Sequence, residues 1–220
     1  MILSALTAPI QWNILILATV AYLVVLLVAM PLHEFAHAWA AVRLGDRTPY
    51  DQGRLTIDPR AHLDLTGALL LAVAGFGWAK PVPFAPYNLR QAPSVKVGIL
   101  LVALAGPIVN LLIAVAAALP LRIGGPAFVR DNLQLAQVLL IVVNINLVLA
   151  VFNMIPLVPL DGSKVLWGLM PDSWSRAYKQ IQQYSLFILL ILMLPIGGAS
   201  LLGRILSPIV QALLQTLTGL

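Results

Sequence analysis

The chain has no cysteine among its 220 residues. That absence excludes disulfide bonds, thiolate metal ligands and a cysteine nucleophile. Charged residues are also scarce, at 10% of the chain, whereas a soluble domain carries about 25%. So few charges cannot cover a water-facing surface, and the composition therefore excludes a soluble globular protein. Glutamate is nearly missing, because Glu34 is the single one in the chain.

Apolar residues make up 60% of the chain and fall into several blocks, the first at about 12–42. A helix that crosses a membrane needs about 20 such residues, so the blocks predict an all-α polytopic membrane protein with about five to six transmembrane helices. We expect one membrane-embedded domain over 1–220. Its core should lie at about 12–170, and its C-terminal helices at about 180–219.

One apolar block, 66–78, is too short to cross a bilayer as a straight helix. Its length of about 13 residues is typical of a re-entrant or partly buried segment. The residues that follow, 79–93, include three prolines within six positions, which exclude a helix there. We therefore expect a re-entrant segment that continues into β-hairpin-like backbone, close to the chemical site described next.

The net charge of +5 lies in the short segments between apolar blocks, not along one helix or stripe. This distribution does not indicate a nucleic-acid partner. If 66–78 does not cross, ten Lys and Arg residues fall on one side of the membrane and two on the other. The ten are Arg43, Arg47, Arg54, Arg60, Lys80, Arg90, Lys96, Lys164, Arg176 and Lys179, and the two are Arg122 and Arg130. Because an excess of basic residues is typical of the cytoplasmic side, we expect a multi-pass protein of the cell membrane with its site toward the cytoplasm.

Two of the three histidines and the single glutamate form an HExxH motif, HEFAH, at 33–37. On a helix, positions i and i+4 lie on one face, so His33 and His37 can bind one zinc ion. Glu34 beside them can act as general base toward water. Ionisable groups within a membrane segment are rare and typical of functional sites. We therefore expect a catalytic Zn²⁺ on the two histidines, with Glu34 as the catalytic base. The alternative is a chance match, or histidines that are merely packed in a core.

Catalytic zinc commonly has three protein ligands and keeps one position for water. Without cysteine, the third ligand must come from His62 or from one of seven aspartates. Six aspartates lie in polar loops, where solvation explains them: Asp46, Asp51, Asp58, Asp64, Asp131 and Asp172. Asp161 instead follows an apolar span, on the same predicted side as the HExxH motif. We expect Asp161 to be the third metal ligand; the alternative is that it caps a short helix over 163–170.

HEFAH (33–37) and NMIPLVPLDG (153–162) together resemble the site-2 protease family of intramembrane zinc metalloproteases. Every fixed position of that family's second motif, N-x-x-P-x-x-P-x-D-G, is present. GFGWAKPVPF (75–84) and the Ala-Gly-Pro-x-x-Asn segment (105–110) are similar to the small prokaryotic members that lack a PDZ domain. The resemblance covers most of the chain from about residue 25 to 170.

The resemblance implies a zinc metalloendopeptidase with His33, His37 and Asp161 as metal ligands and Glu34 as the base. It also implies that Asn153 lines the site, where its amide can stabilise the oxyanion or hold the substrate strand. The alternative for Asn153 is a hydrogen bond between helices, which polar residues in membrane helices often make.

Two further residues are candidates without an assigned role. His62 lies in DPRAHLD (58–64), which resembles a stretch that small family members carry after the metal helix. It can orient a ligand, bind substrate or contact a second metal, and an ordinary loop histidine is the alternative. Asn110 ends the Ala-Gly-Pro-x-x-Asn segment. The alternative to a role at the site is that Asn110 makes a hydrogen bond between helices.

The function that these residues predict is hydrolysis of peptide bonds within or beside transmembrane segments. The expected partners are a transmembrane protein or peptide substrate and the lipid bilayer, while the oligomeric state stays open. Two other classes remain as alternatives. One is a metal-ion transporter, since intramembrane His, Glu and Asp can form an ion path. The other is a catalytically inactive scaffold with the protease fold.

Overall fold

The computed structural model describes residues 16, 19–20, 23–74, 77–196 and 199–220 of the chain. The first part of the predicted first span, Gly75 and Phe76 of the 75–84 segment, and the Gly197-Gly198 pair lie mostly or wholly outside the described residues. The elements in chain order are η1 (Val25–Ala29), α3 (Met30–Arg43), α4 (Thr48–Asp51), α5 (Pro59–His62), α6 (Leu65–Ala74), η2 (Pro86–Asn88), α7 (Val95–Asp131), α8 (Leu133–Asn153), α9 (Asp161–Leu169), η3 (Asp172–Trp174), α10 (Ser175–Gln182), α11 (Ser185–Met193), β1 (Pro195–Ile196), β2 (Ala199–Ser200) and α12 (Leu201–Thr218).

Four helical stretches of the described chain are long and apolar enough to cross a membrane: η1 continued by α3, then α7, α8 and α12. The predicted class of a helical, polytopic membrane protein is therefore confirmed. Two other apolar helices are shorter, because α6 has 10 residues and α11 has 9. The expected number of five to six crossings and the re-entrant segment stay predictions.

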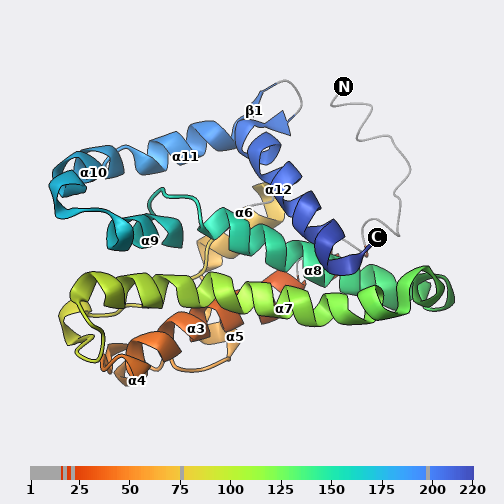
Figure 1. The fold of residues 1–220 in the computed structure, drawn as a ribbon, viewed down its shortest axis with the longest axis horizontal. Coiled ribbons are helices and arrows are strands. Elements are labelled where there is room, and N and C mark those ends of the chain that lie inside the picture. The colour runs from red at the N-terminus through yellow and green to blue at the C-terminus, as the bar shows by residue number, and fades with distance from the viewer. Residues whose placement is uncertain (1–15, 17–18, 21–22, 75–76, 197–198) are drawn as a thin grey trace.

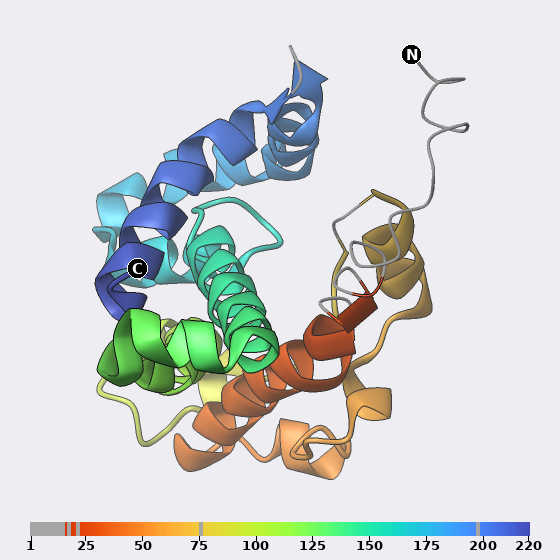
Figure 2. The same cartoon turned by 90° about the vertical axis from the view of Figure 1, so that its right-hand side faces the viewer.

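The longest helix, α7, forms the centre of the bundle. Figures 1 and 2 show α7 and α8 between α3 on one side and the α11–α12 pair on the other. Small side chains allow this close packing, because they let helix backbones approach each other. Ala114 and Ala118 of α7 are buried against Val143 and Leu147 of α8 and Val210 of α12.

The helix α7 is longer than one membrane crossing needs. Its N-terminus is capped by Ser94, whose hydroxyl accepts a hydrogen bond from Val97 N–H. The helix then continues through Pro107 and Pro120, and at Gly125 the backbone turns sharply, with φ 56°. Glycine takes this left-handed conformation without a Cβ penalty. From 95 to 124, before this turn, the helix has 30 residues and would be about 45 Å long, at 1.5 Å a residue, which exceeds the hydrocarbon core of about 30 Å.

The segment that connects α3 to α7 is held by a buried carboxylate. Asp46 is fully buried and accepts hydrogen bonds from Ala85 N–H (2.6 Å), the Thr48 hydroxyl (2.6 Å), Thr48 N–H (3.1 Å) and the Asn88 amide (3.3 Å). The interpretation of Asp46 as a solvated loop residue is therefore wrong. Burial raises the pKa of Asp46, but the hydrogen bonds from Thr48 and Ala85 lower it by more, so the net pKa lies below its ordinary value.

A buried arginine fixes the Pro-rich stretch in the same region. The Arg54 guanidinium donates to the backbone carbonyls of Ala61, Lys80 and Pro81. An antiparallel bridge between Leu63 and Ala79 adds to this connection. The stretch after α6 is thus extended and non-helical as the prolines require, and it is pinned to α5.

Replacing Asp46 with alanine should destabilise the protein by about 2–3 kcal/mol, because it leaves buried N–H donors without an acceptor. Thermal unfolding in detergent micelles measures the effect. Asp51→Ala is the matched control, since Asp51 is an exposed aspartate five positions along the chain, and it should leave the unfolding midpoint unchanged.

The stability difference between wild type and Asp46→Ala should also depend on pH. Because the folded pKa of Asp46 lies below the unfolded value of about 3.9, its contribution is fully present above that value. It is lost as the pH falls toward the folded pKa. The stability difference between wild type and Asp46→Ala should therefore narrow in acid, and a difference that stays constant down to pH 3 would contradict the role given to the ionised carboxylate.

Candidate metal site

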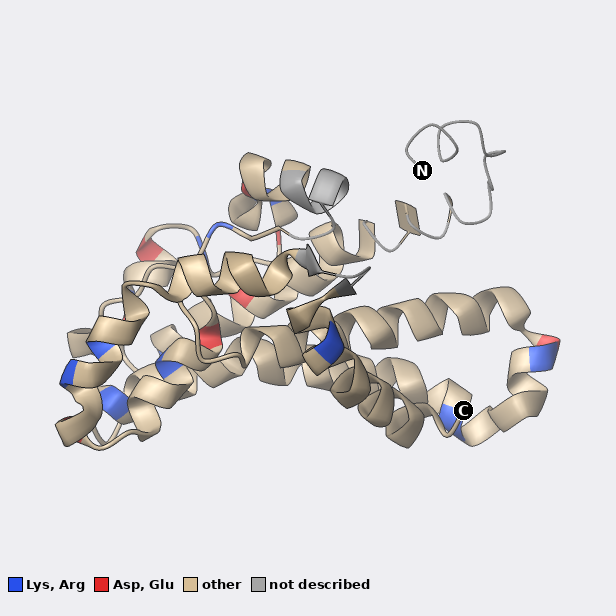
Figure 3. Ribbon diagram, turned by 90° about the horizontal axis from the view of Figure 1, so that it is seen from above, with Lys and Arg blue, Asp and Glu red and all other residues tan. Residues whose placement is uncertain are grey.

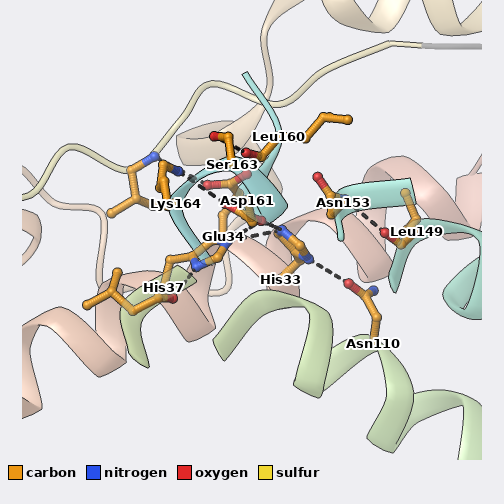
Figure 4. A network of polar contacts seen from close by, with 12 residues as sticks. His33, Glu34, His37, Asn110, Leu149, Asn153, Leu160, Asp161, Ser163 and Lys164 are labelled. Carbon is orange, nitrogen blue, oxygen red and sulfur yellow. Dashed lines mark hydrogen bonds and ion pairs between the residues drawn. The ribbon is translucent and has the colours of Figure 1, made fainter. Parts of the chain in front are cut away.

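Three ionisable side chains from two distant parts of the chain meet inside the bundle (Figure 4). His33 and His37 lie one turn apart on α3, and their Nε2 atoms are 3.0 Å apart. Asp161, the first residue of α9, places Oδ2 3.1 Å from each of these nitrogens. All three residues are buried. The structure thus brings together the three residues that the sequence nominated as metal ligands.

The local backbone explains why Asp161 points at the histidines. A Cβ on Gly162 would lie 2.2 Å from the Met154 carbonyl oxygen, so only glycine allows α9 to begin this close to the end of α8. The short helix begins at Asp161 and not at 163, and its cap residue is Leu160. The alternative interpretation of Asp161 as the helix cap is therefore not what the structure contains.

The remaining oxygen of the Asp161 carboxylate is also occupied. Lys164, one turn along α9, donates from Nζ to Asp161 Oδ1 at 3.1 Å. Because Oδ1 is held by the lysine, Oδ2 is the oxygen that faces the two imidazoles. The sequence held one signal for this contact, because Lys164 lies three positions after Asp161, a spacing that brings side chains together on a helix.

The donor set fits a divalent cation such as Zn²⁺. Val102 O accepts a hydrogen bond from His37 Nδ1 at 2.7 Å. A carbonyl oxygen can only accept, so the proton lies on Nδ1 and Nε2 carries a free lone pair. His33 Nδ1 is likewise engaged, at 2.6 Å from Asn110 Oδ1. Two imidazole nitrogens and one carboxylate oxygen are the three-ligand pattern of catalytic zinc sites.

A glycine makes room for the two rings. A Cβ on Gly106 of α7 would lie 2.5 Å from His37 Nε2 and 2.6 Å from His33 Nε2. The helix backbone therefore passes directly beside the ligand nitrogens, and no side chain fits between them. In the sequence, Gly106 is notable only as part of the Ala-Gly-Pro-x-x-Asn segment that resembles family members. The need for a glycine at this position depends on how α7 packs on α3.

Glu34 lies beside the metal ligands and faces the Pro-rich stretch. Its Oε2 accepts a hydrogen bond from Val82 N–H at 3.3 Å. Glu34 and the three ligands line one cavity of about 170 Å³, which is large enough for several water molecules. Its other lining residues are Met30, Gly77, Trp78, Ala79, Pro81, Val82, Phe84, Val102, Leu149, Phe152, Asn153, Pro159, Leu160 and Lys164.

The other candidate residues occupy three different positions. Asn153 lines the cavity and donates from Nδ2 to Leu149 O, one turn back on its own helix, at 2.9 Å. Asn110 lies behind His33 and outside the residues that line the cavity. His62 is buried and apart from the metal-ligand cluster, with Nε2 2.7 Å from Thr56 O. His62 is therefore not an exposed loop histidine, and the structure does not bring it to the ligands.

The substitution Gly106→Ala should weaken zinc binding at least about tenfold, because the added methyl group displaces both imidazoles. Competition with a chelator on the purified protein measures the zinc affinity. Ile108→Ala changes an exposed residue two positions along the same helix and should leave the affinity unchanged. Wild-type zinc affinity in Gly106→Ala would contradict the packing of α7 against the ligand rings.

Comparisons with known proteins agree with this donor set. The chain is 37% identical over 188 residues to "Putative zinc metalloprotease YwhC" of Bacillus subtilis (strain 168), covering 83% of this chain and 84% of that protein. It is 32% identical over 173 residues to the similarly named Rip2 of Mycobacterium tuberculosis (strain ATCC 25618 / H37Rv), covering 76% of this chain and 64% of that protein. No protein-family model matches the chain, and no solved structure matches it. The extent and level of identity to YwhC show that the chain belongs to the site-2 protease family of membrane zinc metalloproteases.

Proposed function

We propose that this protein is a zinc endopeptidase that hydrolyses peptide bonds within or next to transmembrane segments of other membrane proteins. The observation that carries the proposal is a single cavity, within a bundle of membrane-length helices, that is lined by His33, His37, Asp161 and Glu34. These are the groups that metal-assisted hydrolysis needs, and the family membership supports the same reaction.

In this proposal His33, His37 and Asp161 hold the zinc, which when bound supplies a Lewis acid that lowers the pKa of water to about 7. The Glu34 carboxylate accepts the proton of the attacking water and passes it to the leaving amine. Asn153 lines the same cavity, and its amide N–H that is not bonded to Leu149 is available to the substrate carbonyl oxygen.

The stretch from Gly77 to Phe84 is the proposed contact for the substrate backbone. A transmembrane helix hides its amides in internal hydrogen bonds and must unwind before it is cut. An extended segment can receive the unwound peptide as an added strand. Residues of this stretch line the cavity, and its Val82 N–H already reaches Glu34. The same proposal includes a re-entrant segment. In it α6 enters the membrane without crossing it, and the chain then turns back as the extended stretch that contacts the substrate.

The proposed orientation places the site toward the cytoplasm. Figure 3 shows most Lys and Arg positions toward the end of the molecule that carries α10 and the beginning of α7. The turn between α7 and α8 lies at the opposite end and carries Arg130 and Asp131. By the positive-inside bias, the end that is rich in basic residues faces the cytoplasm of a cell with this protein in its membrane.

Glu34→Gln tests the proposal. It should lower kcat for a transmembrane peptide by about 10²–10⁴, the contribution typical of a general base, and it should leave about one zinc bound, since Glu34 is not a ligand. Zinc content and cleavage are measured on the same detergent-purified samples. Asp51→Asn, which neutralises an exposed carboxylate on α4, is the control and should cut at the wild-type rate.

Other results of these measurements would favour an inactive scaffold or a transporter, or would contradict the metal site. Wild type that binds zinc but cuts none of a panel of transmembrane peptides would favour the inactive scaffold. Zinc flux into vesicles that persists in Glu34→Gln would favour the transporter. A wild-type protein that binds no zinc after the metal is added back would contradict the metal site itself.

A further inference from the structure

Two asparagines inside the apolar bundle connect His33 to the backbone of α8. Asn110 of α7 and Asn146 of α8 are 0% and 1% exposed. Asn110 Oδ1 lies 2.6 Å from His33 Nδ1, and the Asn110 amide donates to Asn146 Oδ1 at 2.8 Å. Asn146 Nδ2 donates to Val142 O at 2.9 Å. The result is a continuous line of hydrogen bonds from a metal-site imidazole to a main-chain carbonyl two helices away.

The carbonyl at the far end sets the direction of every hydrogen bond in this line. Val142 O can only accept, so Asn146 must present its NH₂ group to it and its Oδ1 to Asn110. Asn110 must then donate to Asn146, and its own Oδ1 is left facing His33. Only an N–H can satisfy that oxygen, so the proton of His33 lies on Nδ1.

The opposite direction is costly. Rotating both amides would let Asn110 donate to an unprotonated His33 Nδ1, but it would place Asn146 Oδ1 against Val142 O. Two acceptors would then face each other with no proton between them, at a side chain that is buried in the apolar bundle. Buried polar groups without a partner are strongly disfavoured.

We propose that Asn110 and Asn146 are positioning residues that hold His33 in the tautomer with a free Nε2 lone pair, ready for the metal. Asn146 touches neither the metal ligands nor the cavity and acts only through Asn110. This inference rests on the proposed metal site. It explains why two apolar helices bury a pair of adjacent amides that a plain contact between α7 and α8 does not need.

The competing explanation is that the pair simply joins α7 to α8, as interhelical amide hydrogen bonds do in membrane proteins. That role would affect stability and leave the His33 proton where it is. Because the chain has three histidines, ¹⁵N-edited NMR of the zinc-loaded protein in detergent can assign each ring and detect the Nδ1–H proton of His33. The resonance of that proton and its exchange with water are therefore the readout that separates the two explanations.

The central experiment compares three substitutions on α8. Asn146→Leu should shift the His33 Nδ1–H resonance and speed its exchange with water, because Asn110 can then turn over. It should also weaken zinc binding by about 10- to 100-fold, as loss of an outer partner of a metal ligand does. Asn146→Asp should retain the wild-type resonance, because its protonated carboxyl can donate to Val142 O and offer Asn110 an acceptor. Asn144→Leu alters an exposed asparagine on the same helix and should change neither quantity.

An unchanged His33 Nδ1–H resonance and exchange rate, with zinc affinity within twofold of wild type, in Asn146→Leu would overturn the proposal and leave a purely structural pair. If that variant does not fold, Asn110→Leu removes the acceptor directly and must show the same loss. Neither readout uses peptide cleavage. The expected NMR and zinc-affinity results in a protein that cuts nothing would therefore contradict the proposed function while leaving this inference intact.

Discussion

The structure depends on holding two imidazole lone pairs and a carboxylate oxygen about 3 Å apart in an apolar interior. These electron-rich atoms repel one another unless a cation lies among them. The folded chain must therefore hold them close together and also supply contacts that offset their repulsion. It does so by enclosing the donors on every side. Gly106 admits the rings against α7, Gly162 brings α9 to the end of α8, and each Nδ1 has an acceptor behind it. Burial strengthens every one of these contacts, because the low dielectric of the bundle screens little.

The part of this arrangement that follows the helix period could be predicted from the sequence. His33 and His37 are four residues apart, so one helix face carries both whatever the surrounding fold. Asp161 could be selected because it lies beside an apolar span and the chain offers few other ligands. The helical membrane class follows from composition alone. Each of these predictions rests on the spacing of neighbouring residues or on amino-acid composition. None of them requires knowing how the helices are packed.

The remainder depends on packing between segments that are distant in the chain. Asp46 lies in a polar loop sequence, yet it is buried because Ala85 and Thr48 turn their N–H groups toward it. His62 likewise belongs to a polar segment but is buried, with Nε2 2.7 Å from Thr56 O. The role of Gly106 depends on which turn of α7 faces the histidines, and the Asn110–Asn146 contact joins residues 36 positions apart. Pro107 and Pro120 do not end α7, because prolines that end a helix in water are tolerated within membrane helices.

The acceptors behind the two imidazoles have a common origin. His37 donates to the carbonyl of Val102 directly, and His33 reaches the carbonyl of Val142 through two amides. Helix carbonyls are suitable anchors, since a second lone pair remains after the helical hydrogen bond and the backbone cannot rotate away. An amide side chain, in contrast, can turn over and reverse its polarity. A line of amides therefore transmits a fixed proton position only if one end is tied to a group with a single polarity, which explains why Asn110 alone would be an incomplete partner for His33. The direction of polarity at the site is thus set by the main chain of α7 and α8, and the side chains between carry it to the ring that needs it.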